Sequence, residues 1–222
     1  MIIAIEGIDG AGKTTVLNCL KKFNLKIDGI DIKYFDKKEL NRSINEPEEL
    51  RSLKQLRDII WRDNEANKDP FGALFWIKLI SAWYTYLEPI SHKEMPNELR
   101  IYDGWFYRNI IKTCMREKIT QSKVEIFFED VKHPDLTVLL DVDPQIVWNR
   151  NSEKKASELG YWDGELGDPM KCFINYQSRV RIKLLEMGRA QGWKILTPQE
   201  EDAKQVAQNV ATLIIEYLSN HF

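Results

Sequence analysis

The sequence predicts an α/β domain in which helices cover both faces of a parallel sheet. Short apolar segments typical of buried strands alternate with segments of helical periodicity along the whole chain. This alternation is typical of parallel strands, because each parallel pair needs a crossover connection that is usually a helix. A length of 222 residues fits one such domain, and no internal repeat divides it. We therefore expect residues 1–222 to form a single domain.

The first half of the chain contains three predicted strands, each a short apolar or alternating segment near a turn signal. They cover residues 2–6, 30–35 and 99–103. Apolar residues at helical spacing predict three helices between them. These cover residues 14–24, 46–66 and 70–87, and the last is unusually rich in aromatic side chains.

The second half continues the alternation. Two helices and a clearly buried strand are expected over residues 105–117, 122–131 and 136–142. Asp143 and Pro144 then start a helix, because Asp is a favoured N-cap and Pro suits the first turn. Residues 151–168 lack apolar periodicity and contain three glycines, which predicts a mobile loop. A helix, a strand and a last helix are expected over residues 169–190, 193–197 and 200–219.

Composition narrows the classes of function. The formal net charge is −2, whereas a general nucleic-acid binder usually carries a basic excess, so no nucleic-acid partner is expected. Three widely spaced cysteines, Cys19, Cys114 and Cys172, form no CxxC pair. They indicate a reducing compartment and neither a disulfide framework nor a zinc site. No apolar stretch is long enough to span a membrane, so we expect a cytoplasmic protein without membrane contact.

The stretch GIDGAGKT matches the phosphate-binding P-loop pattern, with glycines at positions 7 and 12 followed by Lys13 and Thr14. It follows a predicted strand and precedes a predicted helix, as phosphate binding at a helix N-terminus requires. Lys13 is expected to reach the β- and γ-phosphates of ATP, and the Thr14 hydroxyl to ligate Mg²⁺. The expected ATP-binding residues are Gly7, Asp9, Gly10, Ala11, Gly12, Lys13, Thr14 and Thr15.

A P-loop also needs a carboxylate on the metal side, at the end of a nearby strand. Asp103 and Asp141 both follow apolar segments. We prefer Asp103, because its strand can lie beside the first strand, and we expect it to bind Mg²⁺ together with Thr14. Asp141 is equally well explained as a strand-end carboxylate that caps the next helix, and Asp143 as a plain N-cap.

Among proteins with P-loops, a small-molecule kinase fits best. The base-reading NKxD motif of GTPases is absent from the sequence, and motors or recombination ATPases are usually longer or more basic. A kinase must close over two substrates and exclude water, which suits a compact domain with a flexible, charged loop late in the chain.

Several motifs resemble the thymidylate kinase family of P-loop nucleoside monophosphate kinases, and together they cover nearly the whole chain. The first and last of them are the most specific. They are IAIEGIDGAGKTT at the start, Asn45-Glu46-Pro47 followed by Leu56-Arg57, ALFW at 73–76, YDGWFYRN at 102–109 and PDLTVLLDVDP at 134–144.

The resemblance implies a P-loop NTPase fold, with a five-stranded parallel sheet in the order 2-3-1-4-5. It also implies an acceptor-binding region over residues 36–97 and a short lid over residues 150–168. The implied reaction transfers the γ-phosphoryl group of ATP to dTMP with the help of Mg²⁺. Members of the family are commonly homodimers, so a homodimer is expected here.

Residue roles follow from the same resemblance. The implied catalytic residues are Lys13, Asp9, Asp103 and Arg150. Asp9 would touch the acceptor sugar or its phosphate, Asp103 would act through magnesium and its water, and Arg150 would start the lid near the donor nucleotide. On the acceptor side, Arg57 would approach the phosphate and Phe75 would stack on the base.

The sequence departs from the family where the acceptor binds. Family arginines are replaced by Asn45 and Gly104 and are missing near Leu79, and each loss removes a charge-assisted contact. We expect Arg108, one helical turn after Asp103, to compensate, and Trp105 to reshape the acceptor pocket. The P-loop also has Gly10 where an arginine can stand, which points to basic lid residues, namely Arg150, Lys154 and Lys155.

Two alternatives remain open at this point. The acceptor of the same kinase could be a nucleoside, a modified pyrimidine nucleotide or a non-nucleotide small molecule, which the missing arginines favour. The chain could instead be a regulatory protein that binds ATP without turnover, which the intact Lys13, Thr14 and Asp103 argue against.

Overall fold

Five parallel strands form one sheet in the order β2-β3-β1-β4-β5, which confirms the predicted order. The computed structural model describes residues 1–38, 47–61, 69–88, 90, 97–150, 153–198 and 202–221. The strands are β1 (Ile2–Gly7), β2 (Asp31–Phe35), β3 (Glu98–Tyr102), β4 (Leu136–Leu140) and β5 (Lys194–Leu196). All residues of β1 and β4 are buried, because these strands lie inside the sheet and are covered on both faces.

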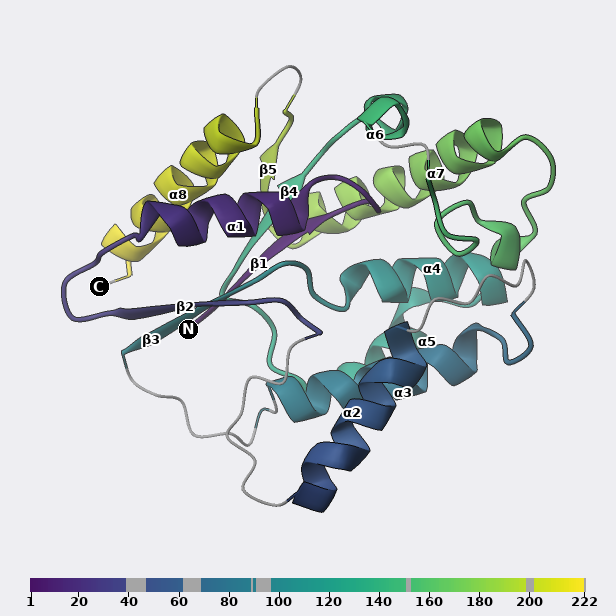
Figure 1. The fold of residues 1–222 in the computed structure, drawn as a ribbon, viewed down its shortest axis with the longest axis horizontal. Coiled ribbons are helices and arrows are strands. Elements are labelled where there is room, and N and C mark those ends of the chain that lie inside the picture. The colour runs from purple at the N-terminus through teal and green to yellow at the C-terminus, as the bar shows by residue number, and fades with distance from the viewer. Residues whose placement is uncertain are drawn as a thin grey trace.

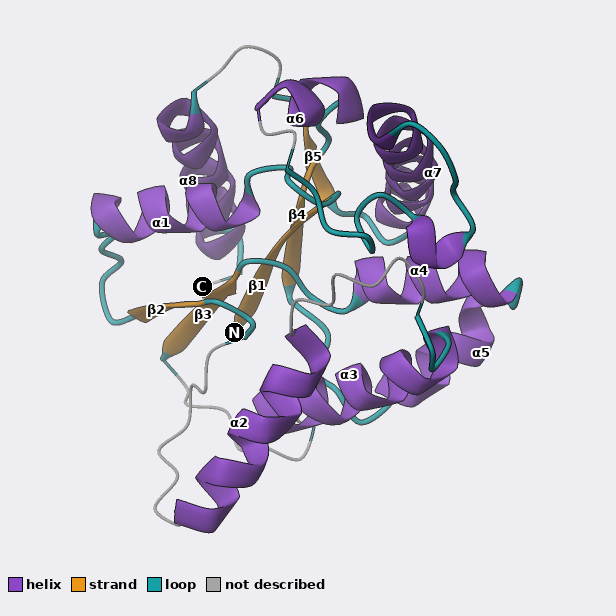
Figure 2. Ribbon diagram, turned by 45° about the vertical axis from the view of Figure 1, so that its right-hand side comes forward, coloured by secondary structure: helices purple, strands orange, loops and turns teal. Residues whose placement is uncertain are grey.

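Helices cover the two faces of the sheet, and the two ribbon views agree on their placement (Figures 1 and 2). On one face lie α1 (Lys13–Phe23) and α8 (Ala203–Ser219), which pack against each other. The opposite face carries α3 (Ala73–Leu87), α4 (Tyr107–Glu117) and α7 (Pro169–Ala190). Three further helices complete this layer. The helix α2 (Pro47–Trp61) packs on α3, α5 (Gln121–Glu125) packs on α4, and α6 (Pro144–Arg150) packs on α7.

Several predicted boundaries are wrong by a few residues. The helix expected from residue 70 begins at Ala73, because Gly72 has a φ of +81° that a right-handed helix cannot contain. The helix expected over 122–131 divides into α5 and a 3₁₀ turn, Ile126–Phe128. The predicted strand over 136–142 ends at Leu140. Residues 62–66 of the helix expected over 46–66 lie outside the described residues.

The segment expected to be a featureless loop, residues 151–168, has structure of its own. Of its described part, Ala156 and Leu159 are buried, and Tyr161–Asp163 form a 3₁₀ turn. Gly160 and Gly164 flank that turn with positive φ angles of +76° and +93°. The glycines therefore shape a folded segment that packs on the domain, which the lack of helical periodicity did not indicate.

The carboxyl ends of β1 and β3 face a common region at the centre of the sheet. The chain leaves β1 into the P-loop and α1, and β3 into the turn that precedes α4. Since β3 and β4 lie on opposite sides of β1, this is the point where the strand order reverses. Ligands of open α/β sheets bind at such a point.

Candidate active site

The P-loop connects β1 to α1 in a conformation suited to phosphate. Gly10 and Gly12 have φ angles of +75° and +91°, which side chains other than glycine rarely adopt. Gly12 is the N-cap of α1 and forms no side-chain cap, and a Cβ placed there would meet nothing within 4 Å. The first turn of α1 therefore has no side-chain cap on its backbone N–H groups, and such a helix N-terminus favours an anion.

Lys13 is buried at the base of this loop. Its ammonium group donates to the carbonyl oxygens of Gly7 at 2.9 Å and Ile8 at 2.7 Å. Burial, together with the positive charges of Arg108 and Lys37, lowers the pKa of Lys13 well below its usual value. An anionic ligand would counter both effects, so the surroundings of Lys13 favour a phosphate.

Thr14 and Asp103 meet at the start of α1. The Thr14 hydroxyl donates to Oδ2 of Asp103 at 2.6 Å, although 89 residues separate them in the sequence. A hydroxyl and a carboxylate are hard oxygen donors of the kind that Mg²⁺ prefers. The structure thus brings together the two residues expected on the metal side, and their donor chemistry fits Mg²⁺.

The competing carboxylates have other partners. Asp141 forms a bidentate ion pair with Arg181 of α7, whose Nε donates to Oδ1 at 2.5 Å and whose Nη2 donates to Oδ2 at 3.0 Å. It therefore braces α7 against the end of β4 and does not cap α6. Asp143 accepts from the Gln145 N–H at 2.7 Å, as expected of an N-cap.

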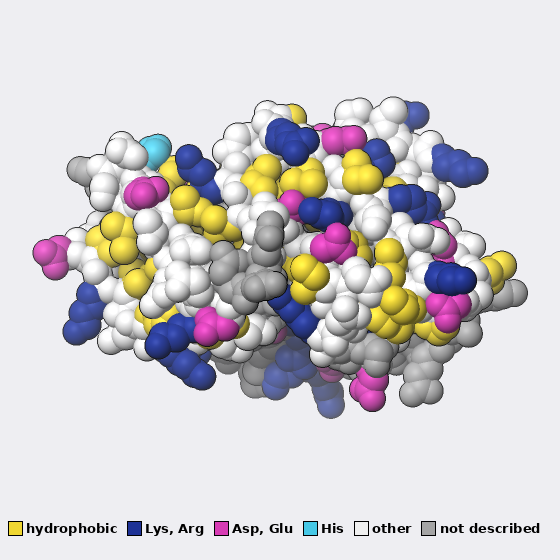
Figure 3. Space-filling model, turned by 90° about the horizontal axis from the view of Figure 1, so that it is seen from above, with side chains coloured by type: hydrophobic (Ala, Val, Ile, Leu, Met, Phe, Trp, Pro, Cys, Tyr) yellow, Lys and Arg dark blue, Asp and Glu magenta, His cyan; other side chains and the backbone are white. Residues whose placement is uncertain are grey.

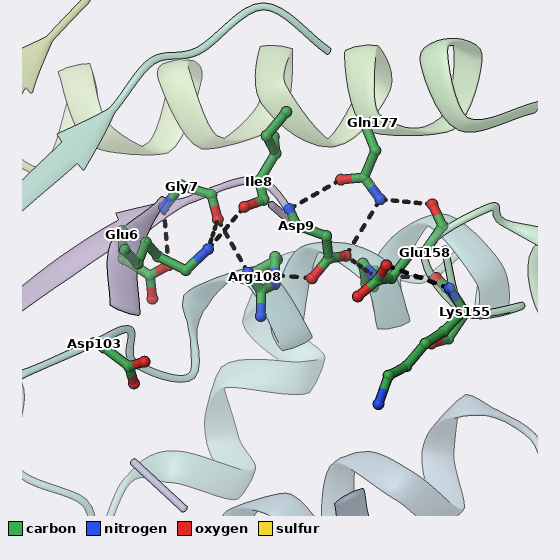
Figure 4. A network of polar contacts seen from close by, with 12 residues as sticks. Glu6, Gly7, Ile8, Asp9, Asp103, Arg108, Lys155, Glu158 and Gln177 are labelled. Carbon is green, nitrogen blue, oxygen red and sulfur yellow. Dashed lines mark hydrogen bonds and ion pairs between the residues drawn. The ribbon is translucent and has the colours of Figure 1, made fainter. Parts of the chain in front are cut away.

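Asp9 is the centre of a polar network that joins α4 and α7 to the P-loop (Figure 4). Its carboxylate accepts from Lys112 of α4 at 2.6 Å and from Gln177 of α7 at 3.2 Å, and it pairs with Arg108 at 3.3 Å. Burial alone would raise the pKa of Asp9, but Arg108, Lys112 and Lys13 outweigh it and hold the pKa well below its usual value. Asp9 is therefore ionised in this setting.

The same network reaches residues 153–168. Gln177 is fully buried; its Nε2 also donates to the Glu158 carbonyl at 2.8 Å, and its Oε1 accepts from the Asp9 N–H at 3.2 Å. Lys112 likewise donates to the Ser157 carbonyl at 3.2 Å. Two side chains thus bind the P-loop and the predicted lid at once. Burial and the charge of Asp9 raise the pKa of Glu158, which lies in the same network.

A cavity of about 390 Å³ opens beside the P-loop. Its charged lining comes from the P-loop and the start of α1, from α4, from the segments that follow β2 and β3, and from residues 153–168. It includes Asp9, Lys13, Lys37, Asp103, Arg108, Lys112 and Arg116, with Asp36, Glu158 and Asp163 as further acidic groups. Its aromatic lining comprises Trp61, Trp76, Trp162 and Tyr176. Trp76 and Trp162 have nearly parallel rings, with centroids 6.4 Å apart. The basic side chains can pair with an anionic group, and the aromatic rings can pack against a flat ring, so the cavity suits a ligand that has both.

Arg108, which the sequence suggests for the acceptor side, lies beside the P-loop at the start of α4. Its guanidinium group lines the cavity and donates to the Gly7 carbonyl at 3.1 Å. Burial would lower its pKa, but Asp9 and Glu6 outweigh burial and raise it, so Arg108 stays charged.

Four other expected site residues do not line this cavity. Trp105 is 1% exposed and packs in the core against Tyr84 and Tyr102, so it does not shape the pocket directly. Phe75 is 40% exposed and stacks on Phe71. Arg57 pairs with its neighbour Asp58 at 2.8 Å, and Arg150 is exposed at the end of α6. Asn45 and Glu46 lie outside the described residues.

Sequence reasoning missed Lys37, Lys112, Gln177 and Trp162. Lys37 lies two residues beyond β2, where a strand-end cation is a usable signal. Lys112 follows Arg108 by four residues, so the two share one face of α4. Gln177 and Trp162 carry no local signal, because their position depends on how α7 and residues 153–168 pack.

Lys154 is the basic residue of the predicted lid that approaches the P-loop. A Cβ on Gly10 would lie 3.5 Å from its ammonium nitrogen. The Lys154 ammonium also lies over the Phe173 ring, 4.9 Å from the centroid. Lys155 lines the cavity.

A second cavity of about 440 Å³ lies at the amino ends of β4 and β5, where Leu136 and Lys194 contribute to its lining. None of the P-loop residues line it, so it is separate from the site described above.

The face seen from above carries Lys and Arg side chains interspersed with Asp and Glu (Figure 3). In the described part of the chain, none of the helices is long and apolar enough to cross a membrane.

Comparisons with known proteins agree on one family. The family model described as thymidylate kinase matches residues 5–210. A thymidylate kinase of Mycoplasmoides gallisepticum is 26% identical, covering 100% of this chain and 97% of the relative. A probable thymidylate kinase of Archaeoglobus fulgidus is 24% identical over 99% and 97%. Among solved structures, thymidylate kinase from Candida albicans superposes with a TM-score of 0.63 at 18% identity, covering 100% of this chain and 93% of that one. These matches confirm the expected P-loop NTPase fold.

Proposed function

The chain belongs to the thymidylate kinase family, and on that premise we propose that it transfers the γ-phosphoryl group of ATP to dTMP. The products are ADP and dTDP. The observation that carries the proposal is the convergence of Lys13, Thr14 and Asp103 in a cavity that is also lined by basic side chains of α4 and by aromatic rings. Phosphoryl transfer depends mainly on positioning and charge neutralisation, and this cavity offers both.

On the donor side, the P-loop amides and Lys13 hold the ATP phosphates, while Thr14 and Asp103 hold Mg²⁺. A bound Mg²⁺ supplies neutralising charge to the phosphates of the donor. The Lys13 ammonium group lies against the Gly7 and Ile8 carbonyls of the same loop, so its charge is within the segment that would hold the phosphates. Lys154 supports the same end, because it approaches the P-loop opposite Gly10.

On the acceptor side, Arg108 and Lys112 keep Asp9 ionised and fixed near the sugar of the acceptor. Trp76 and Trp162 provide the aromatic wall for its base. Arg57, Phe75 and Arg150 keep the roles implied by the family as predictions, since their side chains lie outside the cavity lining. Trp105 acts through the core beneath the site.

A substrate panel tests the proposed function. ATP turnover is measured with each nucleoside monophosphate, with nucleosides and without acceptor, at saturating Mg²⁺. We expect dTMP to give the highest kcat/KM. Turnover confined to a nucleoside or a non-nucleotide would contradict the proposal.

The variant Lys13→Ala tests the P-loop assignment. It should lower kcat with every acceptor by at least about 100-fold, because it removes a charge from the transferring phosphates. The matched control is Lys22→Ala, an exposed lysine in the last turn of α1. An unchanged rate in Lys13→Ala would show that phosphate is not held at this loop.

A homodimer and a cytoplasmic location are proposed from the family and the composition. Light scattering of the purified chain tests the first, and a molar mass equal to the 26.1 kDa monomer would reject it. Fractionation of the source cells tests the second, and recovery in the membrane fraction would reject it.

A further inference from the structure

Gly104 follows the metal-side carboxylate and occupies a crowded place in the site. A Cβ at this position would lie 2.7 Å from the ammonium nitrogen of Lys37 and 3.7 Å from Cε of Lys13. Two lysine side chains from different elements therefore converge on the space that a side chain at position 104 would fill. The φ of Gly104 is +111°, a conformation that side chains other than glycine rarely adopt.

The strand register brings Lys37 to this place. In the parallel pair of β2 and β3, Phe35 lies opposite Tyr102, so the residues two positions further along are Lys37 and Gly104. The turn that contains Gly104 is fixed from the other side by Glu6, which accepts from the Trp105 N–H at 2.7 Å. The contact between Lys37 and Gly104 thus follows from the sheet and its ends.

Several bonds hold Lys37 in position. Its N–H donates to Oδ1 of Asp103 at 3.3 Å, and its ammonium group donates to the Asp103 carbonyl at 3.4 Å. Its own carbonyl accepts from the buried Trp83 indole at 2.8 Å. Lys37 is 7% exposed and lines the cavity. Its backbone is therefore fixed, and its charged end faces the place where substrates bind.

The Lys37 ammonium makes no direct ion pair in the described part of the chain, although the carboxylates of Asp103, Glu6 and Asp9 act on it from further away. The carbonyl of Asp103 is its hydrogen-bond acceptor there, and no carboxylate oxygen of the described residues lies within ion-pair distance. A buried ammonium that no anion contacts directly is unfavourable. A phosphate in the cavity would supply this direct contact.

We propose that Lys37 binds the phosphate of the acceptor nucleotide, taking the place of a cationic side chain at position 104. This rests on the proposed function and names a residue for its acceptor side. Lys13 serves the donor phosphates from the P-loop, and Lys37 approaches from β2. Glycine at position 104 leaves room for the ammonium group, which contacts a phosphate as a compact charge with three donors.

Equilibrium binding tests the proposal with the variant Lys37→Met, which keeps most of the side-chain volume and removes the charge. Affinity for dTMP should fall about 10- to 100-fold, as expected for loss of a charge-assisted contact. Affinity for thymidine, which has no phosphate, should change less than twofold, and so should the KM for ATP. The matched control is Lys26→Met, an exposed lysine before β2.

A merely structural role of Lys37 predicts a different pattern. Equal losses of dTMP and thymidine affinity would overturn the proposal, and so would a rise in the KM for ATP alone. If the wild type phosphorylates dTMP and the Lys37→Met variant binds dTMP with unchanged affinity, this inference is rejected and the proposed function stands. Wild-type protein that neither binds nor phosphorylates dTMP would reject both.

A second variant addresses the same contact without removing the lysine. Gly104→Ala places a Cβ against the Lys37 ammonium group and should also weaken dTMP binding. If both variants act through that group, the double variant should bind dTMP no more weakly than Lys37→Met. Fully additive losses in the double variant would overturn the proposal. Thermal unfolding of each variant confirms that folded protein is compared.

Discussion

At the scale of single residues, two glycines of the site are each approached by a lysine from another segment. Gly10 in the P-loop lies beside Lys154, and Gly104 after β3 lies beside Lys37. At position 104 the sequence lacks the arginine that the family resemblance implies, and at position 10 it lacks an arginine that can stand in the P-loop. The charge is therefore not simply lost, because the structure brings a cation to each place from a different part of the chain.

Asp103 carries a testable consequence of the metal-side assignment. Asp103→Asn should raise the Mg²⁺ concentration needed for half-maximal rate about 10- to 100-fold, because an amide is a weaker ligand than a carboxylate. Thr14 keeps its hydroxyl and supplies the other donor. The measurement is the initial rate across a Mg²⁺ titration at saturating ATP and dTMP.

The matched control is Asp141→Asn, at the end of β4 on the other side of β1. It weakens the ion pair with Arg181 and should lower stability, while its Mg²⁺ dependence stays that of the wild type. If the two variants showed the same Mg²⁺ dependence, Asp103 would not be the metal-side residue.

At the scale of elements, the P-loop and residues 153–168 are joined through α4 and α7. Gln177 provides the most direct link, since it bonds Asp9 in the P-loop and the Glu158 carbonyl at the same time. Removing its amide leaves the Asp9 N–H and the Glu158 carbonyl without this partner. The position of the predicted lid is therefore sensitive to a buried residue that does not itself line the cavity.

Gln177→Met should loosen this link while keeping the volume. We expect a loss of about 1–3 kcal/mol in the free energy of unfolding, because buried polar groups lose their partner. Amide hydrogen exchange over residues 157–160 should become faster, and exchange in β1 and β4 should not. Gln208→Met, on the exposed side of α8, is the control. Unchanged exchange over residues 157–160 would show that Gln177 does not hold this segment.

At the scale of the whole molecule, an ion cluster fastens the edge of the sheet. Glu98 at the start of β3 is 8% exposed and pairs with Lys33 of β2 at 2.5 Å and with Arg100. Arg100 also pairs with Glu88 at the end of α3, at 2.5 Å. Strands β2 and β3 and the helix α3 are thus connected at one corner.

This cluster makes stability depend on pH. Burial would raise the pKa of Glu98, but the hydrogen bonds from Lys33 and Arg100 outweigh it, so the pKa lies below the ordinary value of 4.5. The folded state therefore favours the ionised form. Its contribution to stability is present above pH 4.5 and disappears as the pH falls through the lowered pKa.

Glu98→Gln should therefore lower the free energy of unfolding by about 1–2 kcal/mol at pH 7. The effect is modest because Lys33 is half-exposed, and an ion pair with a solvent-exposed partner contributes little. The difference from wild type should shrink as the pH falls below 4.5. Urea unfolding at pH 7 and at successively lower pH values measures both. A difference that stays constant across this range would contradict the assignment.

The sequence by itself determined the architecture and the donor half of the site. Buried strands such as β1 and β4 appear as continuous apolar runs, and phosphate binding at the P-loop depends on residues within eight positions of each other. Local patterns of this kind are legible without a structure, because neighbouring residues carry both the conformation and the chemistry. The need of a P-loop for a strand-end carboxylate predicted that Asp103 joins Thr14, and the resemblance of motifs added the strand order.

The acceptor half was decided by tertiary structure. Lys37 reaches the site only through the register of β2 on β3, and Gln177 only through the packing of α7 beneath the P-loop. Trp105, which the sequence suggested for the pocket, is in the core because the turn after β3 directs it inward. Such positions depend on contacts between residues far apart in the chain, and spacing along the sequence does not encode them.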